Sequence, residues 1–148
     1  MVKKIVIIED DENHAKVFDL GLQKSDFPTQ VTVLSSELEV QAWLETWTDE
    51  DCPDLILLDL NLGGCSGLEL LGRLRRIMPL SRVPILVLSS SANPHHLQEA
   101  YAQGANSYML KPISFDQTLR NLRAVCEFWL VCHDVERDGV VSWGGHRP

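Results

Sequence analysis

A chain of 148 residues, 45% apolar and 23% charged, has the composition of an ordinary globular domain and enough material for one sizeable core. Its net charge of −8 disfavours non-specific nucleic-acid binding and favours a protein, cation or small-molecule partner, and no apolar run is long enough to span a membrane. The four cysteines, at positions 52, 65, 126 and 132, form no C-x-x-C pair and no zinc-like spacing, which indicates reduced thiols in a cytoplasmic protein.

Five apolar runs of β type recur along the chain at regular intervals. They are Ile5–Ile8, Val31–Leu34, Leu55–Leu58, Ile85–Leu88 and Ala105–Leu110. Several are nearly continuous rather than alternating, as expected of parallel strands that are covered on both faces. The sequence therefore predicts a buried parallel sheet.

Stretches of helical periodicity separate these runs. The apolar stripes comprise Ala15, Phe18 and Leu22, then Val40, Trp43, Leu44 and Trp47, then Leu68, Leu71 and Leu74. Asn93 before Pro94 predicts the start of a fourth helix, and Gly104 predicts its end. Residues 114–117, Ser-Phe-Asp-Gln, have the spacing of a capping box at the start of the last helix.

The alternation of strands and helices predicts a flavodoxin-like (βα)5 fold, a doubly wound parallel sheet of five strands between two helical layers. One domain is expected over residues 1–133. Residues 134–148 are polar and contain several glycines, which predicts a tail that is loosely ordered, or packed on the last helix or on a dimer partner.

Polar side chains follow the strand ends. Glu9 and Asp10 follow the first run, Asp59 the third, Ser89 the fourth, and Lys111 the fifth. In doubly wound sheets ligands bind outside the carboxyl ends of the strands, so these residues are expected to meet at one edge. Carboxylates that lie so close repel each other in a partly desolvated site, and a hard divalent cation such as Mg²⁺ relieves that repulsion.

This combination resembles the receiver domain of two-component response regulators, over about residues 3–132. The resemblance implies that Asp59 accepts a phosphoryl group from the phosphohistidine of a sensor histidine kinase. It also implies that Glu9, Asp10 and the backbone carbonyl of Asn61 hold Mg²⁺, with Asp10 as the more direct carboxylate ligand. A carboxylate is a weak but adequate nucleophile toward a phosphoramidate, and the product is an acyl phosphate.

The remaining family positions are also assigned by resemblance. Ser89 stands where the family usually has threonine, and with Lys111 it would stabilise the phosphoryl group. Ser89 and Tyr108 would form the conformational switch, and Pro112 would follow a cis peptide bond. Gly63 replaces the usual proline, so a looser loop with altered dephosphorylation is expected.

The last helix is predicted to place a stripe of five residues in the core: Phe115, Leu119, Leu122, Cys126 and Trp129. Its end is apolar nearly all round, which requires cover from the tail or from a second subunit. The segment Glu-Phe-Trp-Leu at 127–130 resembles phytochrome-associated single-domain response regulators. That resemblance implies a homodimer through the last strand and helix, with four interface candidates: Phe128, Trp129, Leu130 and Val131.

The predicted function is a stand-alone response regulator that catalyses only its own phosphorylation and dephosphorylation. Its implied partners are a sensor histidine kinase of phytochrome type and, downstream, a phosphotransfer protein. The alternative is a receiver-like binding module that signals without phosphate. A flavodoxin-like cofactor binder is disfavoured, because the acids of residues 9–12 would repel a phosphate. His95 and His96 are expected to be solvated surface residues without a partner.

Overall fold

The computed structural model, which describes residues 2–26, 28–77, 80–135 and 141–143, is built on a parallel five-stranded sheet. The strands are β1 (Lys3–Ile8), β2 (Thr29–Leu34), β3 (Leu55–Asp59), β4 (Ile85–Ser89) and β5 (Ser107–Leu110). Their spatial order is β2-β1-β3-β4-β5, which is the flavodoxin-like order of doubly wound sheets. The predicted fold is therefore confirmed.

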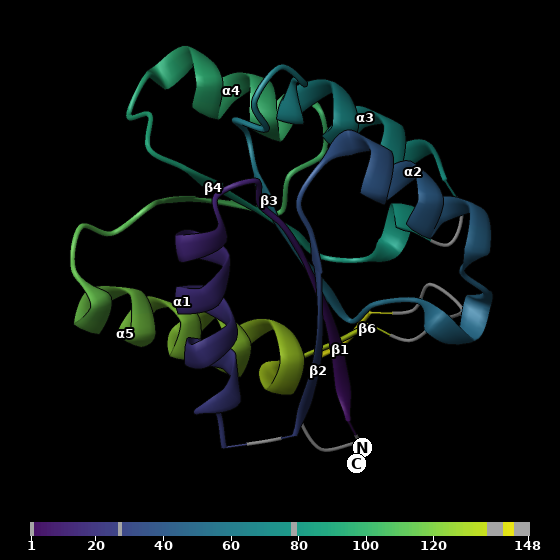
Figure 1. Ribbon diagram of the computed structural model, residues 1–148. Helices are drawn as coiled ribbons and strands as arrows, with labels where there is room; N and C mark the ends of the chain where they lie inside the picture. Colours follow the sequence, from purple (N-terminus) through teal and green to yellow (C-terminus); the bar gives the residue numbers. More distant parts are fainter. Residues whose placement is uncertain (1, 27, 78–79, 136–140, 144–148) are drawn as a thin grey trace.

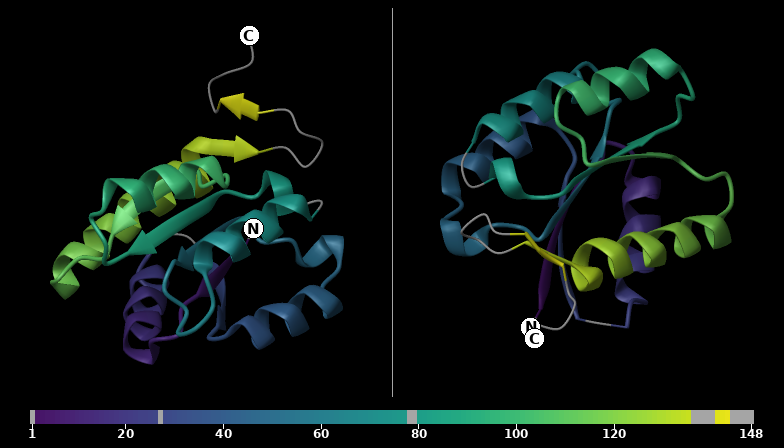
Figure 2. Two further views of the ribbon diagram at one scale, coloured as in Figure 1. Left: turned by 90° about the horizontal axis from the view of Figure 1, so that it is seen from above. Right: turned by 180° about the vertical axis from the view of Figure 1, so that it is seen from behind.

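Five helices cover the two faces of the sheet. They are α1 (Glu12–Gln23), α2 (Glu37–Thr46), α3 (Gly67–Arg76), α4 (Pro94–Ala102) and α5 (Phe115–Cys126). In Figures 1 and 2, α1 and α5 lie on one face, and α2, α3 and α4 lie on the other. Two short 3-10 turns, η1 (Asp49–Asp51) and η2 (Leu80–Arg82), precede β3 and β4. Within the described residues, no helix combines the length and apolarity that crossing a bilayer requires.

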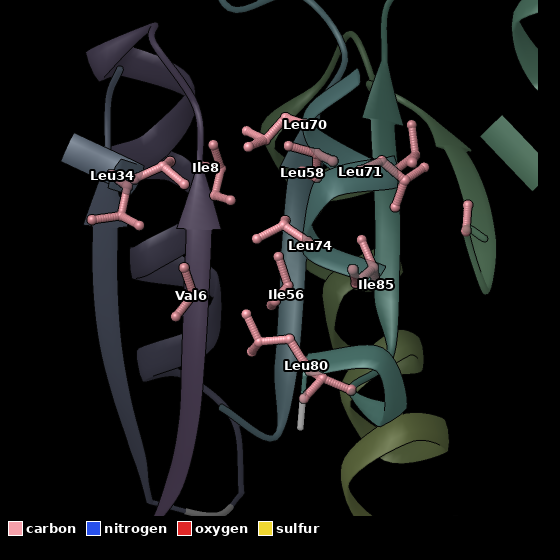
Figure 3. Close-up of a cluster of buried hydrophobic side chains, with 14 of the residues drawn as sticks. Val6, Ile8, Leu34, Ile56, Leu58, Leu70, Leu71, Leu74, Leu80 and Ile85 are labelled. Carbon is pink, nitrogen blue, oxygen red and sulfur yellow. The ribbon is translucent and has the colours of Figure 1, made fainter. Parts of the chain in front are cut away.

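The core consists of two apolar layers, one on each face of the sheet. Every residue of β3 and β4 is buried, whereas the edge strand β2 is only partly covered. Figure 3 shows one layer, in which Ile56 and Leu58 of β3 face the α3 residues Leu70, Leu71 and Leu74. The continuous apolar runs of the sequence thus mark strands that are covered on both sides, as predicted.

The two predicted ends of α4 are confirmed, and the second explains a late strand start. Asn93 accepts a hydrogen bond from the His95 amide at 3.0 Å. At the other end Gly104 has φ 105°, and the amides of Gly104 and Ala105 bond to carbonyls of the last helical turn. This Schellman arrangement uses Ala105 to finish the helix. Strand β5 consequently starts at Ser107 and not at Ala105 as predicted.

The capping box predicted for α5 is only half formed. The Ser114 hydroxyl accepts a hydrogen bond from the Gln117 amide at 3.1 Å, so Ser114 is the N-cap. The Gln117 side chain does not return the bond, because its Oε1 accepts from Arg120 Nη2 at 2.9 Å while its Nε2 donates to Asn121 Oδ1 at 2.8 Å. A side-chain partner one turn ahead replaces the reciprocal contact.

The end of α5 departs from a regular helix. It continues as the π-helical turn η3 (Glu127–Cys132), which leads into an antiparallel hairpin of β6 (His133–Val135) and β7 (Val141–Trp143), shown in Figure 2 beyond the end of α5. The wider turn changes which side chains face the sheet. Leu130 is only 5% exposed and joins the core, whereas Phe115 is exposed, so the predicted core stripe is wrong at Phe115.

Gly67 opens α3 directly against the end of β3. A Cβ at this position would lie 2.5 Å from Leu60 Cα and 2.6 Å from the Asp59 carbonyl oxygen. We expect Gly67→Ala to lower the free energy of unfolding by about 1–3 kcal/mol, because backbone atoms cannot rotate away. Denaturant titration measures this. Gly21→Ala is the control with a smaller loss, since the Cβ there meets the ends of the Leu122 and Leu119 side chains. Equal losses in the two variants would contradict the backbone clash.

Candidate functional site

The topology brings the acids of β1 and β3 to one point. Strands β1 and β3 are neighbours, with Ile8 paired to Leu58, so Glu9 and Asp59 are level at the carboxyl edge. The strand order reverses here, because the chain leaves β1 toward β2 on one side and reaches β4 and β5 on the other. Such a switch point leaves a crevice for ligands at the carboxyl ends of the strands.

Three carboxylates meet in this crevice. Glu9, Asp10 and Asp59 each offer an oxygen, and these oxygens lie within 4.8 Å of one another. Glu9 is 1% exposed and Asp59 4%, whereas Asp10 is at the surface. Lys111, from the end of β5, reaches across to the cluster. Its Nζ lies 2.8 Å from Glu9 Oε2 and 3.0 Å from Asp59 Oδ2.

Burial and charge set the ionisation of the pair at the centre. Burial raises the pKa of Glu9 to about 7. The nearby Lys111 ammonium opposes this rise, and the charge of Asp59 adds to it. Burial alone would lower the pKa of Lys111, but its contacts with the carboxylates of Glu9 and Asp59 outweigh burial and raise that pKa. The ammonium therefore stays charged and holds the two acids together.

Asp11 has a different role from the other two acids after β1. Its Oδ1 accepts hydrogen bonds from the amides of Asn13 at 2.8 Å and His14 at 3.3 Å, which makes Asp11 the N-cap of α1. These bonds lower the pKa of Asp11. Asp11 thus caps the helix, whereas the neighbouring Glu9 and Asp10 belong to the carboxylate cluster.

The donor set fits a hard divalent cation. Glu9 Oε2 is buried and, among the described residues, accepts no hydrogen bond of acceptable geometry, although the ammonium of Lys111 is close. In the described part of the chain, Glu9, Asp10 and Asp59 are the one group of three acids, histidines or cysteines close enough for a shared ion. Oxygen donors partly open to solvent suit Mg²⁺, which keeps several waters.

The loop after β3 folds around this cluster. The Asn61 amide donates to Asp59 Oδ1 at 3.1 Å, and Asn61 forms an antiparallel bridge with Ser66. Gly63 has φ 57°, a conformation that favours glycine, and a Cβ there would lie 3.0 Å from Asp10 Oδ2. The loop backbone thus approaches Asp10 closely at Gly63.

Ser89 and Tyr108 lie on the neighbouring strands. The Ser89 carbonyl accepts a hydrogen bond from the Lys111 amide at 2.8 Å, and the Ser89 hydroxyl accepts one from the Ser91 amide at 3.1 Å. Tyr108 is half-buried against the core, and its hydroxyl donates to the Ser91 carbonyl at 2.7 Å. Tyr108 is therefore both a packing residue and a hydrogen-bond donor to the β4–α4 loop. The cis peptide before Pro112 stays a prediction from the resemblance.

Sequence analysis missed two residues of this site. His14 Nδ1 lies 3.2 Å from Lys111 Nζ, and since a lysine only donates, His14 accepts this bond. His14 is four residues after Asp10, and that helical spacing is the signal that could have identified it. Ser91 bonds to both Ser89 and Tyr108, and the run of polar residues 89–91 before Asn93 is its signal.

The fold and the site together define a doubly wound α/β protein with an acidic, lysine-bridged crevice at its switch point. The sequence matches the response regulator receiver domain family over residues 5–123, and the chain belongs to that family.

Individual relatives agree with this assignment. The chain is 28% identical over 131 residues to the response regulator Rcp1 of Synechocystis sp. This match covers 86% of this chain and 89% of Rcp1. The match to the Mn²⁺-bound structure of Rcp1 covers 87% of this chain and 95% of the Rcp1 chain, with 28% identity and a TM-score of 0.77. The phosphorylated cyanobacterial phytochrome response regulator RcpA gives a TM-score of 0.80 at 29% identity, covering 95% of this chain and 99% of RcpA.

A longer relative matches as well. The chain is 30% identical over 146 residues to the phosphate regulon transcriptional regulatory protein PhoB of Rhizobium meliloti. This match covers 93% of the chain but 62% of PhoB, so the chain spans less than two thirds of that relative.

The raised pKa of Glu9 makes stability depend on pH. The folded state binds the Glu9 proton more tightly than the unfolded state, with a pKa of about 7 against 4.5. The stabilising contribution is therefore complete below pH 4.5 and is lost as the pH rises through about 7. In buffer with EDTA, we expect the unfolding free energy of the wild type, relative to Glu9→Gln, to fall by about 2–3 kcal/mol between pH 5 and 8.

Denaturant titrations at several pH values measure this difference. The surface variant Glu45→Gln should follow the wild type throughout. Parallel pH curves for the wild type and Glu9→Gln would show that Glu9 does not titrate in this range.

Proposed function

We propose that this receiver domain accepts a phosphoryl group on Asp59 from the phosphohistidine of a sensor histidine kinase, in a Mg²⁺-dependent reaction. The contact of the Lys111 ammonium with both Asp59 and Glu9 carries the proposal. It keeps Asp59 at the edge of the sheet with a positive charge beside it, where a phosphoryl group would need one. The reaction takes place in the cytoplasm, in agreement with cysteine spacings that predict reduced thiols.

The chemistry is an in-line displacement at phosphorus. An Asp59 oxygen forms the new O–P bond, the N–P bond of the phosphohistidine breaks, and the departing imidazole keeps the electron pair and takes a proton. Glu9, Asp10 and the Asn61 carbonyl would hold Mg²⁺, which neutralises charge on the phosphoryl oxygens when it is bound. The Mn²⁺-bound form of Rcp1 supports this choice of cation site.

Two side chains then change partners. The Lys111 ammonium moves from the Asp59 carboxylate to a phosphoryl oxygen, and the Ser89 hydroxyl donates to another. Because Ser91 links Ser89 to Tyr108, a shift of Ser89 reaches the Tyr108 ring. Signalling then follows from a shift in the populations of two conformations of the surface around α4 and β5.

The partner and assembly proposals are based on the last helix. Phe128 is 47% exposed and lies edge-on to Trp129, with ring centroids 5.0 Å apart. Leu130 is buried in the core of its own chain, so we no longer count it as an interface candidate. We retain Phe128 and Trp129, and also Val131, whose side chain lies outside the described part of the chain. The Glu-Phe-Trp-Leu segment and the likeness to the phytochrome response regulator RcpA support a homodimer and a phytochrome-type kinase partner. A phosphotransfer protein is the proposed acceptor downstream.

Phosphoryl uptake tests the central proposal. With Mg²⁺ and phosphoramidate, the intact mass should rise by one phosphoryl group, and removal of Mg²⁺ by EDTA should abolish this change. Asp59→Asn should show no uptake, because an amide is not a nucleophile toward phosphorus. Asp11→Asn, which alters a nearby acid outside the cluster, should be labelled like the wild type. A wild type that stays unlabelled would instead favour a phosphate-independent binding module.

Self-association tests the dimer. We expect Phe128→Ala to weaken dimerisation roughly tenfold, since exposed aromatic residues commonly dominate interface energies. Sedimentation equilibrium with and without phosphoramidate measures it. Leu38→Ala removes an exposed apolar side chain on α2 and should leave dimerisation unchanged. A wild type that is monomeric under both conditions would contradict the dimer.

A further inference from the structure

The loop between β4 and α4 is a continuous series of side-chain turns. The Ser89 hydroxyl accepts from the Ser91 amide at 3.1 Å, and the Ser91 hydroxyl accepts from the Asn93 amide at 3.2 Å. The Asn93 side chain then accepts from the His95 amide at 3.0 Å. Each acceptor lies two residues before its donor, which is the pattern of Ser and Asx turns. The loop geometry is therefore determined largely by these alternate side chains.

His96 anchors the middle of this series from α4. Its Nδ1 lies 2.8 Å from the Ser91 hydroxyl oxygen, and no other side-chain partner of His96 is present among the described residues. Because the Ser91 oxygen already accepts from the Asn93 amide, its own proton is available to donate to His96. With the Ser91 hydroxyl as donor, His96 Nδ1 is the acceptor. His96 is exposed, as expected, but it has a side-chain partner.

The anchored loop determines how the Ser89 hydroxyl is used. Ser89 Oγ accepts from the Ser91 amide, so its own proton is not needed for that bond. The Ser89 hydroxyl proton is thus available to a different oxygen, at the carboxyl edge of the sheet where Asp59 lies. The Ser91 carbonyl meanwhile accepts from the Tyr108 hydroxyl at 2.7 Å. Ser91 consequently connects Ser89, Tyr108 and α4. The contact with His96 fixes the position of the Ser91 side chain.

We propose that His96 is a positioning residue for phosphoryl binding: through the Ser91 hydroxyl it holds the β4–α4 loop so that the Ser89 hydroxyl donates to the phosphoryl group on Asp59. This inference rests on the proposed function. His96 does not touch the reacting atoms. It acts through two hydrogen bonds, from the Ser91 hydroxyl to His96 and from the Ser91 amide to Ser89.

Beryllofluoride with Mg²⁺ is the probe, because it mimics a phosphoryl group on an aspartate without being turned over. Its dissociation constant is measured by ¹⁹F NMR on the full chain. We expect His96→Ala and Ser91→Ala each to weaken binding about three- to tenfold, the worth of one hydrogen bond. The double variant should bind no more weakly than the weaker single variant, because both changes break the same contact.

Two further variants separate positioning from general destabilisation. His96→Asn places an amide oxygen near the position of Nδ1 and should bind within about twofold of the wild type. His95→Ala removes the neighbouring exposed imidazole, whose side chain makes no hydrogen bond within the described residues, and should also match the wild type. Since His96 is exposed, the thermal midpoint of His96→Ala should stay within about 2 °C of the wild type.

The outcomes are distinct. Unchanged binding by His96→Ala, additive losses in the double variant, or failure of His96→Asn to restore binding would each overturn the positioning role while the proposed function stands. A wild type that does not bind beryllofluoride would overturn the proposed function, and this inference with it.

Discussion

The ammonium of Lys111 between two buried carboxylates is the contact on which the rest of this molecule depends. Glu9 and Asp59 are placed side by side by the pairing of β1 with β3, and they would repel each other without a cation between them. Removing one member of such a buried set leaves a charge without compensation. The crevice is therefore held together by the positive charge of Lys111, which the proposed phosphorylation of Asp59 would also use.

The route from this crevice to the surface passes through a short loop. The Ser91 amide donates to the Ser89 hydroxyl, the Ser91 carbonyl accepts from the Tyr108 hydroxyl, and the Ser91 hydroxyl contacts His96. A backbone segment with three such partners moves as a unit, because displacing it breaks several hydrogen bonds together. The loop therefore links a change at the Ser89 hydroxyl to both β5 and α4, without requiring movement of the buried strands.

Two local features affect the ends of the molecule. Gly63, in the position normally held by proline, brings the loop backbone close to Asp10 in a conformation that favours glycine. At the other end of the molecule, the π-helical turn after α5 brings Leu130 into the core and leaves Phe128 exposed. The first feature affects the acidic site, and the second affects the surface offered to a partner.

The sequence by itself determined the order of strands and helices, the starts of α4 and α5 and the residues at the strand ends, because apolar runs, capping residues and strand-end acids are local patterns. It could not determine that Asp11 would cap α1 while Glu9 turned inward, nor that His14 and Ser91 would join the site, because these contacts depend on packing between distant elements. The same holds for Leu130, which the wide turn after Cys126 brings into the core. Side-chain direction at the ends of elements is a tertiary property, because it is set by whichever neighbour supplies the missing hydrogen bond or apolar surface.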